Sequence, residues 1–120
     1  MGRFLRSLGA AIAGITATAR EERHFRFHLL ATVSAITVGA LIGLAPWEWV
    51  ALTFAIAAVL AAELFNTAIE RLADRVCKNQ DPLIGRAKDC GAAATLVAAI
   101  AALAIGVLIF GPKILAWLRA

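Results

Sequence analysis

Long apolar segments alternate with short polar clusters along the chain. Three segments carry few or no charges and approach the length of about 20 residues that a helix needs to cross a bilayer: 27–45, 48–70 and 91–110. We therefore predict three transmembrane helices. Pro46 is expected to end the first and Gly111-Pro112 the third, because proline interrupts helical hydrogen bonding. Trp47 and Trp49 fall in the short turn after the first segment, as interfacial aromatic side chains do.

The first 20 residues follow a different pattern. Apolar residues recur every three or four positions, at Phe4, Leu8, Ile12, Ile15 and Ala19. Arginines lie off this stripe, so residues 1–20 are expected to form an amphipathic helix on the membrane surface. The segment could also be a secretory signal, but glycines interrupt its apolar run, and the surface helix is favoured.

Composition places the whole chain in the membrane class. Of its 120 residues, 62% are hydrophobic and 17% are charged, which is too apolar for an ordinary soluble domain. One membrane domain, residues 1–120, accounts for the length. The net charge of +4 comes from basic residues that flank apolar segments, which favours anionic lipid headgroups over nucleic acid. The two cysteines match neither a metal site nor a disulfide framework.

Basic residues are distributed unevenly around the apolar segments. Five precede the first segment, none lies between the first and second, and five lie between the second and third: Arg71, Arg75, Lys78, Arg86 and Lys88. Because cytoplasmic loops carry the excess of Lys and Arg, we predict a cytoplasmic N-terminus and an outside C-terminus. Seven of the eight acidic residues fall on the same predicted cytoplasmic face, all except Glu48.

A polar stripe marks the end of the second apolar segment. Glu63, Asn66, Glu70 and Asp74 are spaced i, i+3, i+7 and i+11, which places them on one side of a helix, within a sector of about 80°. Glu63 follows a stretch, Val50 to Ala62, that carries no charge. A carboxylate at this depth is costly unless it is paired or functional, so the stripe is a candidate site.

Simple surface pairing is the alternative interpretation. Glu70 and Asp74 could pair with nearby basic residues, and Glu22 could pair with Arg26 one turn later. For Glu22 alone, the local pair is the favoured interpretation. His28 is as readily interfacial as functional.

The grouping of carboxylates, an amide and basic side chains on one membrane face suits phosphate chemistry. Magnesium prefers carboxylate oxygens and shares its shell with substrate phosphates. Phosphoryl transfer also needs a cation on the phosphates and a proton acceptor. No P-loop motif occurs. The residues by themselves therefore indicate a membrane enzyme that handles phosphate, without specifying a kinase.

Two motifs add a resemblance. The sequences ELFNTAIERLADRV (63–76) and DPLIGRAKDCGAAATLVAA (81–99) resemble the small bacterial integral-membrane diacylglycerol kinase and undecaprenol kinase family. The resemblance covers nearly the whole chain. It implies an all-α integral membrane fold with a surface helix and three transmembrane helices. It also implies a homotrimer with active sites shared between subunits, in the bacterial cytoplasmic membrane.

The resemblance assigns roles to individual residues. Glu63 would be the general base on the lipid hydroxyl, and Glu22 and Glu70 would bind Mg²⁺, which reverses the favoured interpretation of Glu22. The remaining roles concern ATP and substrate. Nucleotide and phosphate binding would involve Asn66, Lys88, Asp89 and Asp74. Substrate binding would involve Arg3 and Glu63.

The segment before the first apolar helix and two single residues indicate which lipid is the substrate. The segment ERHFRFHLLA (22–31) is similar to the undecaprenol kinase branch typified by Gram-positive bacteria. His28 and Ile12 depart from the acidic residue and the Trp that are usual in diacylglycerol kinases of Gram-negative type. We therefore expect undecaprenol as the lipid alcohol, with diacylglycerol as the alternative.

Two other classes of function are compatible with the pattern. A small oligomeric transporter could use Glu63 as a coupling acid, but transport sites tend to lie near the bilayer midplane. Glu63 lies only eight residues before Arg71, about 12 Å along a helix. A purely structural oligomer would leave the polar stripe unexplained. Protection against thermal unfolding by Mg-ATP separates a kinase from both.

Overall fold

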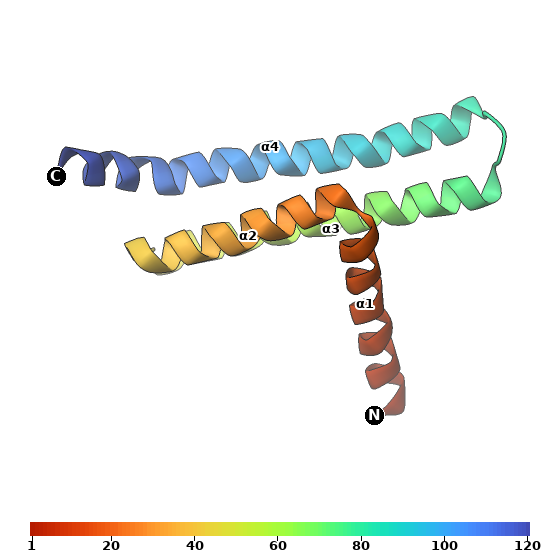
Figure 1. Cartoon of the computed structure of the whole chain (residues 1–120), viewed down its shortest axis with the longest axis horizontal. Coiled ribbons are helices and arrows are strands. Elements are labelled where there is room, and N and C mark those ends of the chain that lie inside the picture. Colours follow the sequence, from red (N-terminus) through yellow and green to blue (C-terminus); the bar gives the residue numbers. More distant parts are fainter.

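The computed structural model describes residues 1–120 and contains four helices. They are α1 (Gly2–Glu21), α2 (Arg23–Ile42), α3 (Pro46–Val76) and α4 (Pro82–Arg119). Helices α2, α3 and α4 lie alongside one another, and α1 points away from them (Figure 1). Each of α2, α3 and α4 is long and apolar enough to cross a membrane. The prediction of an all-helical chain with three such helices is confirmed.

The turn between α2 and α3 is made by glycine. Gly43 has φ +72° and follows the last residue of α2, a left-handed conformation that glycine adopts without steric cost. Pro46 then opens α3. The expectation that Pro46 ends the preceding helix is therefore wrong. Proline suits the first helical turn because its missing N–H has no intrahelical acceptor there.

Helix α4 begins at a side-chain cap and continues past an internal proline. Asp81 Oδ1 accepts hydrogen bonds from the backbone N–H groups of Leu83 (2.8 Å) and Ile84 (3.4 Å). The helix runs through Pro112 to Arg119, so the expected break at Gly111-Pro112 is wrong. Proline removes one hydrogen bond there. Contacts of Ile109 and Lys113 with neighbouring elements hold the helix on both sides of it.

Few residues are buried within the single chain. Helix α3 packs most extensively against α4, and Leu44, Leu52 and Ile109 form a small buried cluster. Large apolar side chains such as Phe54 and Leu108 are exposed. An exposed apolar surface of this kind is the expected outer face of a protein that lies in lipid.

One charged pair joins the ends of two long helices. The Glu48 carboxylate is buried, accepts a hydrogen bond from the Ala45 backbone N–H at 2.7 Å, and lies 3.0 Å from Lys113 Nζ. Glu48 belongs to the first turn of α3, whereas Lys113 lies in the last two turns of α4. The pair therefore fastens the α2–α3 turn to α4.

Removing one partner of this pair should destabilise the fold. In Lys113→Met, the buried Glu48 carboxylate loses its only cationic partner, which is unfavourable in a poorly hydrated position. We expect a lower midpoint of thermal unfolding in detergent. Lys113→Arg keeps the charge and should retain most of the wild-type midpoint. Equal midpoints for wild type and Lys113→Met would show that the pair does not stabilise the fold.

Candidate active site

The bend between α1 and α2 is centred on Glu22, which is half-buried. Arg26 Nη1 donates hydrogen bonds to the carbonyl oxygens of Arg20 (2.8 Å) and Ala19 (3.4 Å). These are end carbonyls of α1 that lack helical donors. Arg26 thus caps α1, and the structure contains no pair between Arg26 and Glu22. The Glu22 carboxylate is left available for another partner.

An ion pair attaches this bend to α3. Arg71 Nη2 lies 2.7 Å from Glu21 Oε2. Glu21 precedes Glu22 in the chain, and Arg71 follows Glu70. The two candidate magnesium ligands, Glu22 and Glu70, are therefore each adjacent in sequence to one partner of the same ion pair.

The polar stripe on α3 is partly buried. Glu63 is 8% exposed, and Asn66 Nδ2 donates a hydrogen bond to Glu70 Oε1 at 3.1 Å. The structure contains no ion pair between Glu70 and a basic residue. The surface-pairing alternative therefore does not describe Glu70.

Beyond the bend, α3 and α4 form a hairpin that extends past the α1–α2 junction (Figure 1). Within it, Lys88 Nζ lies 2.8 Å from Asp74 Oδ1. Asp74 thus pairs across to α4 and not with a neighbour on its own helix. Asp89 is exposed and makes no side-chain hydrogen bond. The hairpin gathers the nucleotide and phosphate candidates at the end of the molecule away from the C-terminus.

Asn66 lies directly against the backbone of α4. A Cβ atom added at Gly91 would be 2.5 Å from Asn66 Oδ1, so only glycine allows this approach. The same oxygen is buried and has no hydrogen-bond partner. A buried acceptor without a donor is unfavourable. Gly91 therefore determines how Asn66 is oriented toward Glu70.

Gly91→Ala should disturb Asn66 without disrupting the fold, since the clashing atom ends a movable side chain. Loss of the Asn66–Glu70 hydrogen bond is worth about 1.5 kcal/mol, or about tenfold in an equilibrium constant. We expect the KM for ATP to rise by about that factor. Gly85→Ala on the same helix has open space around its added Cβ and should leave KM unchanged. If both variants have the same KM for ATP as wild type, Gly91 does not contribute to the nucleotide site.

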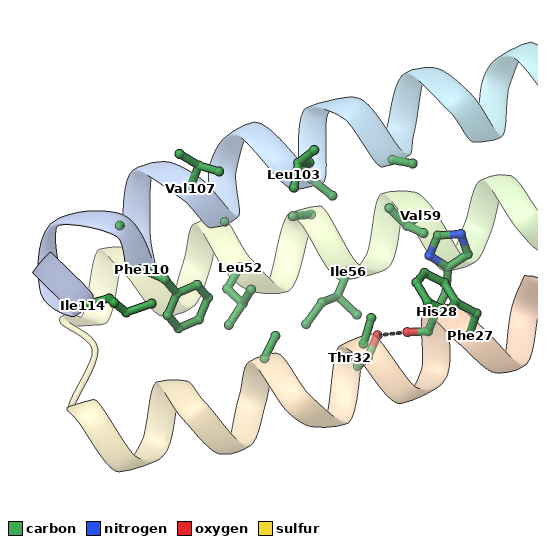
Figure 2. Close-up of a pocket in the computed structure, with 17 residues that line it drawn as sticks. Phe27, His28, Thr32, Leu52, Ile56, Val59, Leu103, Val107, Phe110 and Ile114 are labelled. Atoms are coloured by element: carbon green, nitrogen blue, oxygen red, sulfur yellow. Dashed lines mark hydrogen bonds between the residues drawn. The ribbon is translucent and has the colours of Figure 1, made fainter.

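An apolar groove of about 630 Å³ lies over α3, between α2 and α4 (Figure 2). It is lined by 17 residues, of which 13 are hydrophobic. Phe110 and Ile114 lie at one end, and Phe27 and His28 lie at the other (Figure 2). His28 Nε2 is 3.2 Å from Glu63 Oε1. The groove therefore ends at His28, and His28 in turn contacts the buried Glu63 carboxylate.

Magnesium suits the acidic residues near the bend. Glu22 and Glu70 supply carboxylate oxygens, the donors that the ion prefers. The single chain nowhere gathers three or more acidic, histidine or cysteine side chains into a metal cluster. Magnesium, however, commonly uses one or two protein carboxylates and completes its shell with water and substrate phosphates. The residues present therefore fit a magnesium ion that is shared with a nucleotide.

One candidate residue stands apart from the others. Arg3 is exposed and lies near the free end of α1, which points away from the other helices (Figure 1). Within one chain the structure does not bring Arg3 to Glu63.

Comparison with known proteins identifies the family. The family model described as prokaryotic diacylglycerol kinase matches residues 9–110. The chain is 40% identical over 114 residues to the undecaprenol kinase of Bacillus subtilis (strain 168), with 95% of this chain and 93% of that protein covered. The chain belongs to the prokaryotic diacylglycerol kinase family.

Other members of this family are similar at lower identity. The diacylglycerol kinase of Pseudomonas aeruginosa is 38% identical over 96 residues, covering 80% of this chain and 78% of that protein. The diacylglycerol kinase of Escherichia coli (strain K12) is 32% identical over 100 residues, covering 83% and 82%.

Family membership confirms the recognition from the two motifs. The protein is a lipid kinase, an enzyme that requires a phosphoryl donor such as ATP. The transporter and structural oligomer interpretations are no longer needed. Sequence reasoning leaves His28 undecided, because nothing in a helical pattern indicates that its ring meets Glu63 on another helix.

Proposed function

We propose that the protein is an ATP- and magnesium-dependent kinase that phosphorylates the primary hydroxyl of undecaprenol. One observation carries this proposal: an apolar groove ends at His28, whose Nε2 lies 3.2 Å from the buried Glu63 carboxylate. A lipid tail in the groove would bring its hydroxyl to a proton acceptor. The 40% identity to the Bacillus subtilis undecaprenol kinase favours the polyprenol as the substrate.

Glu63 is the general base in this mechanism. Its burial beside apolar segments keeps bulk water away from the reacting hydroxyl. The carboxylate accepts the hydroxyl proton while the lipid oxygen bonds to the γ-phosphorus of ATP, and the bond from that phosphorus to the oxygen of ADP breaks. Proton acceptance by a positioned carboxylate contributes about 10²- to 10⁴-fold to the rate.

The remaining polar residues bind and orient the nucleotide. Glu22 and Glu70 would hold magnesium, which when bound reduces the negative charge on the phosphates. Lys88 supplies a cation, held 2.8 Å from Asp74. Asn66 and Asp89 complete the nucleotide and phosphate site, with Asp74 in a supporting role. Arg3 is assigned to substrate binding through the end of α1.

The functional unit in this proposal is a homotrimer with shared active sites. One feature supports it: Arg3 lies in the first turn of α1, whose N-terminal end points away from the helices that include α3 and its Glu63 (Figure 1). A neighbouring subunit could supply what one chain lacks. Helix α1 would lie on the membrane surface with its arginines toward the headgroups.

The orientation follows from charge. Ten of the twelve Lys and Arg residues lie before the apolar part of α2 or around the α3–α4 turn. We therefore propose that this end faces the cytoplasm of a bacterial cell, in the inner membrane, and that the C-terminus lies outside. The apolar segments within the helices are taken as about 27–45, 48–70 and 91–110. ATP would then reach the α3–α4 hairpin from the cytoplasm.

Diacylglycerol is the second candidate substrate. Relatives named diacylglycerol kinase share 32% and 38% identity with the chain, and both lipids present a primary hydroxyl at the interface. The chemistry proposed for Glu63 would serve either one.

The first experiment is phosphorylation by the purified protein in detergent, with undecaprenol, ATP and Mg²⁺. We expect undecaprenyl phosphate and an equal amount of ADP, and no product when EDTA removes the metal. Absence of a phosphorylated lipid from folded protein, with diacylglycerol tested in parallel, would contradict the proposed function.

A further inference from the structure

His28 is the only side chain within ion-pair distance of Glu63 in the structure. His28 Nε2, on α2, lies 3.2 Å from Glu63 Oε1, on α3. Both side chains are shielded from solvent, with 22% and 10% of their surface exposed. The contact is an ion pair by distance, and the structure shows no hydrogen bond of good geometry between the two side chains.

Glu63 needs such a partner because it is buried and follows an uncharged stretch of α3. A buried carboxylate without a donor or cation is strongly unfavourable. The other cationic side chains that form ion pairs are engaged elsewhere: Arg71 with Glu21, Lys88 with Asp74, and Lys113 with Glu48. His28 is therefore the side chain that forms an ion pair with Glu63 in this chain.

The His28 ring also lies at one end of the groove (Figure 2). The Phe27 ring packs edge-on against it, with ring centroids 5.5 Å apart. The Thr32 hydroxyl donates to the His28 carbonyl oxygen at 2.8 Å, one turn further along α2 (Figure 2). A lipid hydroxyl that arrives through the groove would thus meet His28 and Glu63 together.

We propose that His28 is a positioning residue for the phosphoryl-transfer step. This rests on the proposed function, in which Glu63 is the base. The His28 Nε2–H group holds Glu63 Oε1, so that Oε2 faces the lipid hydroxyl. Oε2 takes the hydroxyl proton as the lipid oxygen bonds to the γ-phosphorus and ADP departs with the electron pair of the broken P–O bond. His28 neither gains nor loses a proton in this step.

Three substitutions test whether the donor at Nε2 is what matters. His28→Leu removes the N–H donor. His28→Asn supplies an amide N–H group on a side chain that is too short to reach Glu63, and His28→Gln supplies one at a distance comparable to that of the ring Nε2. We expect kcat to fall about 10- to 100-fold in the Leu and Asn variants and to be largely restored in the Gln variant. The KM for ATP should not change in any of them. His24→Leu, an exposed histidine on the same helix, is the matched control and should behave as wild type.

Several outcomes would overturn the inference. These are an unchanged kcat in the Asn variant, equal losses in the Gln and Asn variants, or a change confined to the KM for the lipid. The Gln and Asn comparison remains decisive if the Leu variant does not fold. Failure of the proposed function looks different: wild type would form no phosphorylated lipid, or Glu63→Gln would remain active.

Discussion

Replacing Glu63 with glutamine is expected to abolish phosphoryl transfer to the lipid while leaving ATP binding intact. The substitution keeps the size of a side chain that is 10% exposed and removes only its capacity to accept a proton. Because a positioned base contributes about 10²- to 10⁴-fold, kcat should fall by a factor in that range. The measurement is steady-state formation of the phosphorylated lipid, together with titration of Mg-ATP binding.

The binding titration separates loss of chemistry from loss of fold. Glu63 does not take part in the Asn66–Glu70 hydrogen bond or the Asp74–Lys88 pair, so the nucleotide dissociation constant should remain within about twofold of wild type, less than about 0.4 kcal/mol. A kcat near that of wild type would exclude Glu63 as the base. A joint loss of catalysis and nucleotide binding would instead make Glu63 part of the binding site.

Replacing Glu70 with glutamine should raise the Mg²⁺ concentration required for half-maximal activity by about 10- to 100-fold. Loss of groups that merely support metal ligands has effects of this size, and loss of a ligand carboxylate should have at least as large an effect. The introduced amide could still accept the hydrogen bond from Asn66 Nδ2 that Glu70 accepts at 3.1 Å. The measurement is a Mg²⁺ titration of activity at saturating ATP and lipid.

Asp81→Asn is the matched control for this change. It also removes one negative charge near the α3–α4 turn. Asparagine can still cap α4 through the Leu83 and Ile84 N–H groups. Its Mg²⁺ requirement should remain that of wild type. If Glu70→Gln shows an unchanged requirement, Glu70 does not bind the metal. If both variants shift equally, general electrostatic attraction explains the effect.

The features that the sequence could predict are those that depend on one helix at a time. Apolar length indicated three candidate membrane helices, and spacing placed Glu63, Asn66 and Glu70 on one face. The hydrogen bond between Asn66 and Glu70 follows from the i, i+4 relation. The family motifs also lie within single helices, which is why recognition succeeded without any knowledge of packing.

The features that could not be predicted depend on contacts between helices. His28 meets Glu63 across α2 and α3, and Lys113 meets the buried Glu48 across 65 positions of sequence. The sequence places Glu48 in a polar turn, and only the packing of α4 shows why it is buried. The continuation of α4 through Pro112 has the same origin, because flanking contacts outweigh the lost hydrogen bond.

The arrangement of the α1–α2 bend was also beyond a local reading of the sequence. Spacing suggested that Glu22 pairs with Arg26 one turn later, yet Arg26 caps the end of α1. A helix that ends at Glu21 leaves carbonyl groups without donors. An arginine that satisfies them is then no longer available to the neighbouring carboxylate.

The most direct test of the central claim is a competition between two lipids. Undecaprenol and diacylglycerol are mixed at equal concentration in detergent micelles with the protein, ATP and Mg²⁺, and both phosphorylated products are quantified. The product ratio equals the ratio of kcat/KM values. We predict that undecaprenyl phosphate predominates. A predominance of phosphatidic acid would contradict the assignment of the polyprenol as the substrate.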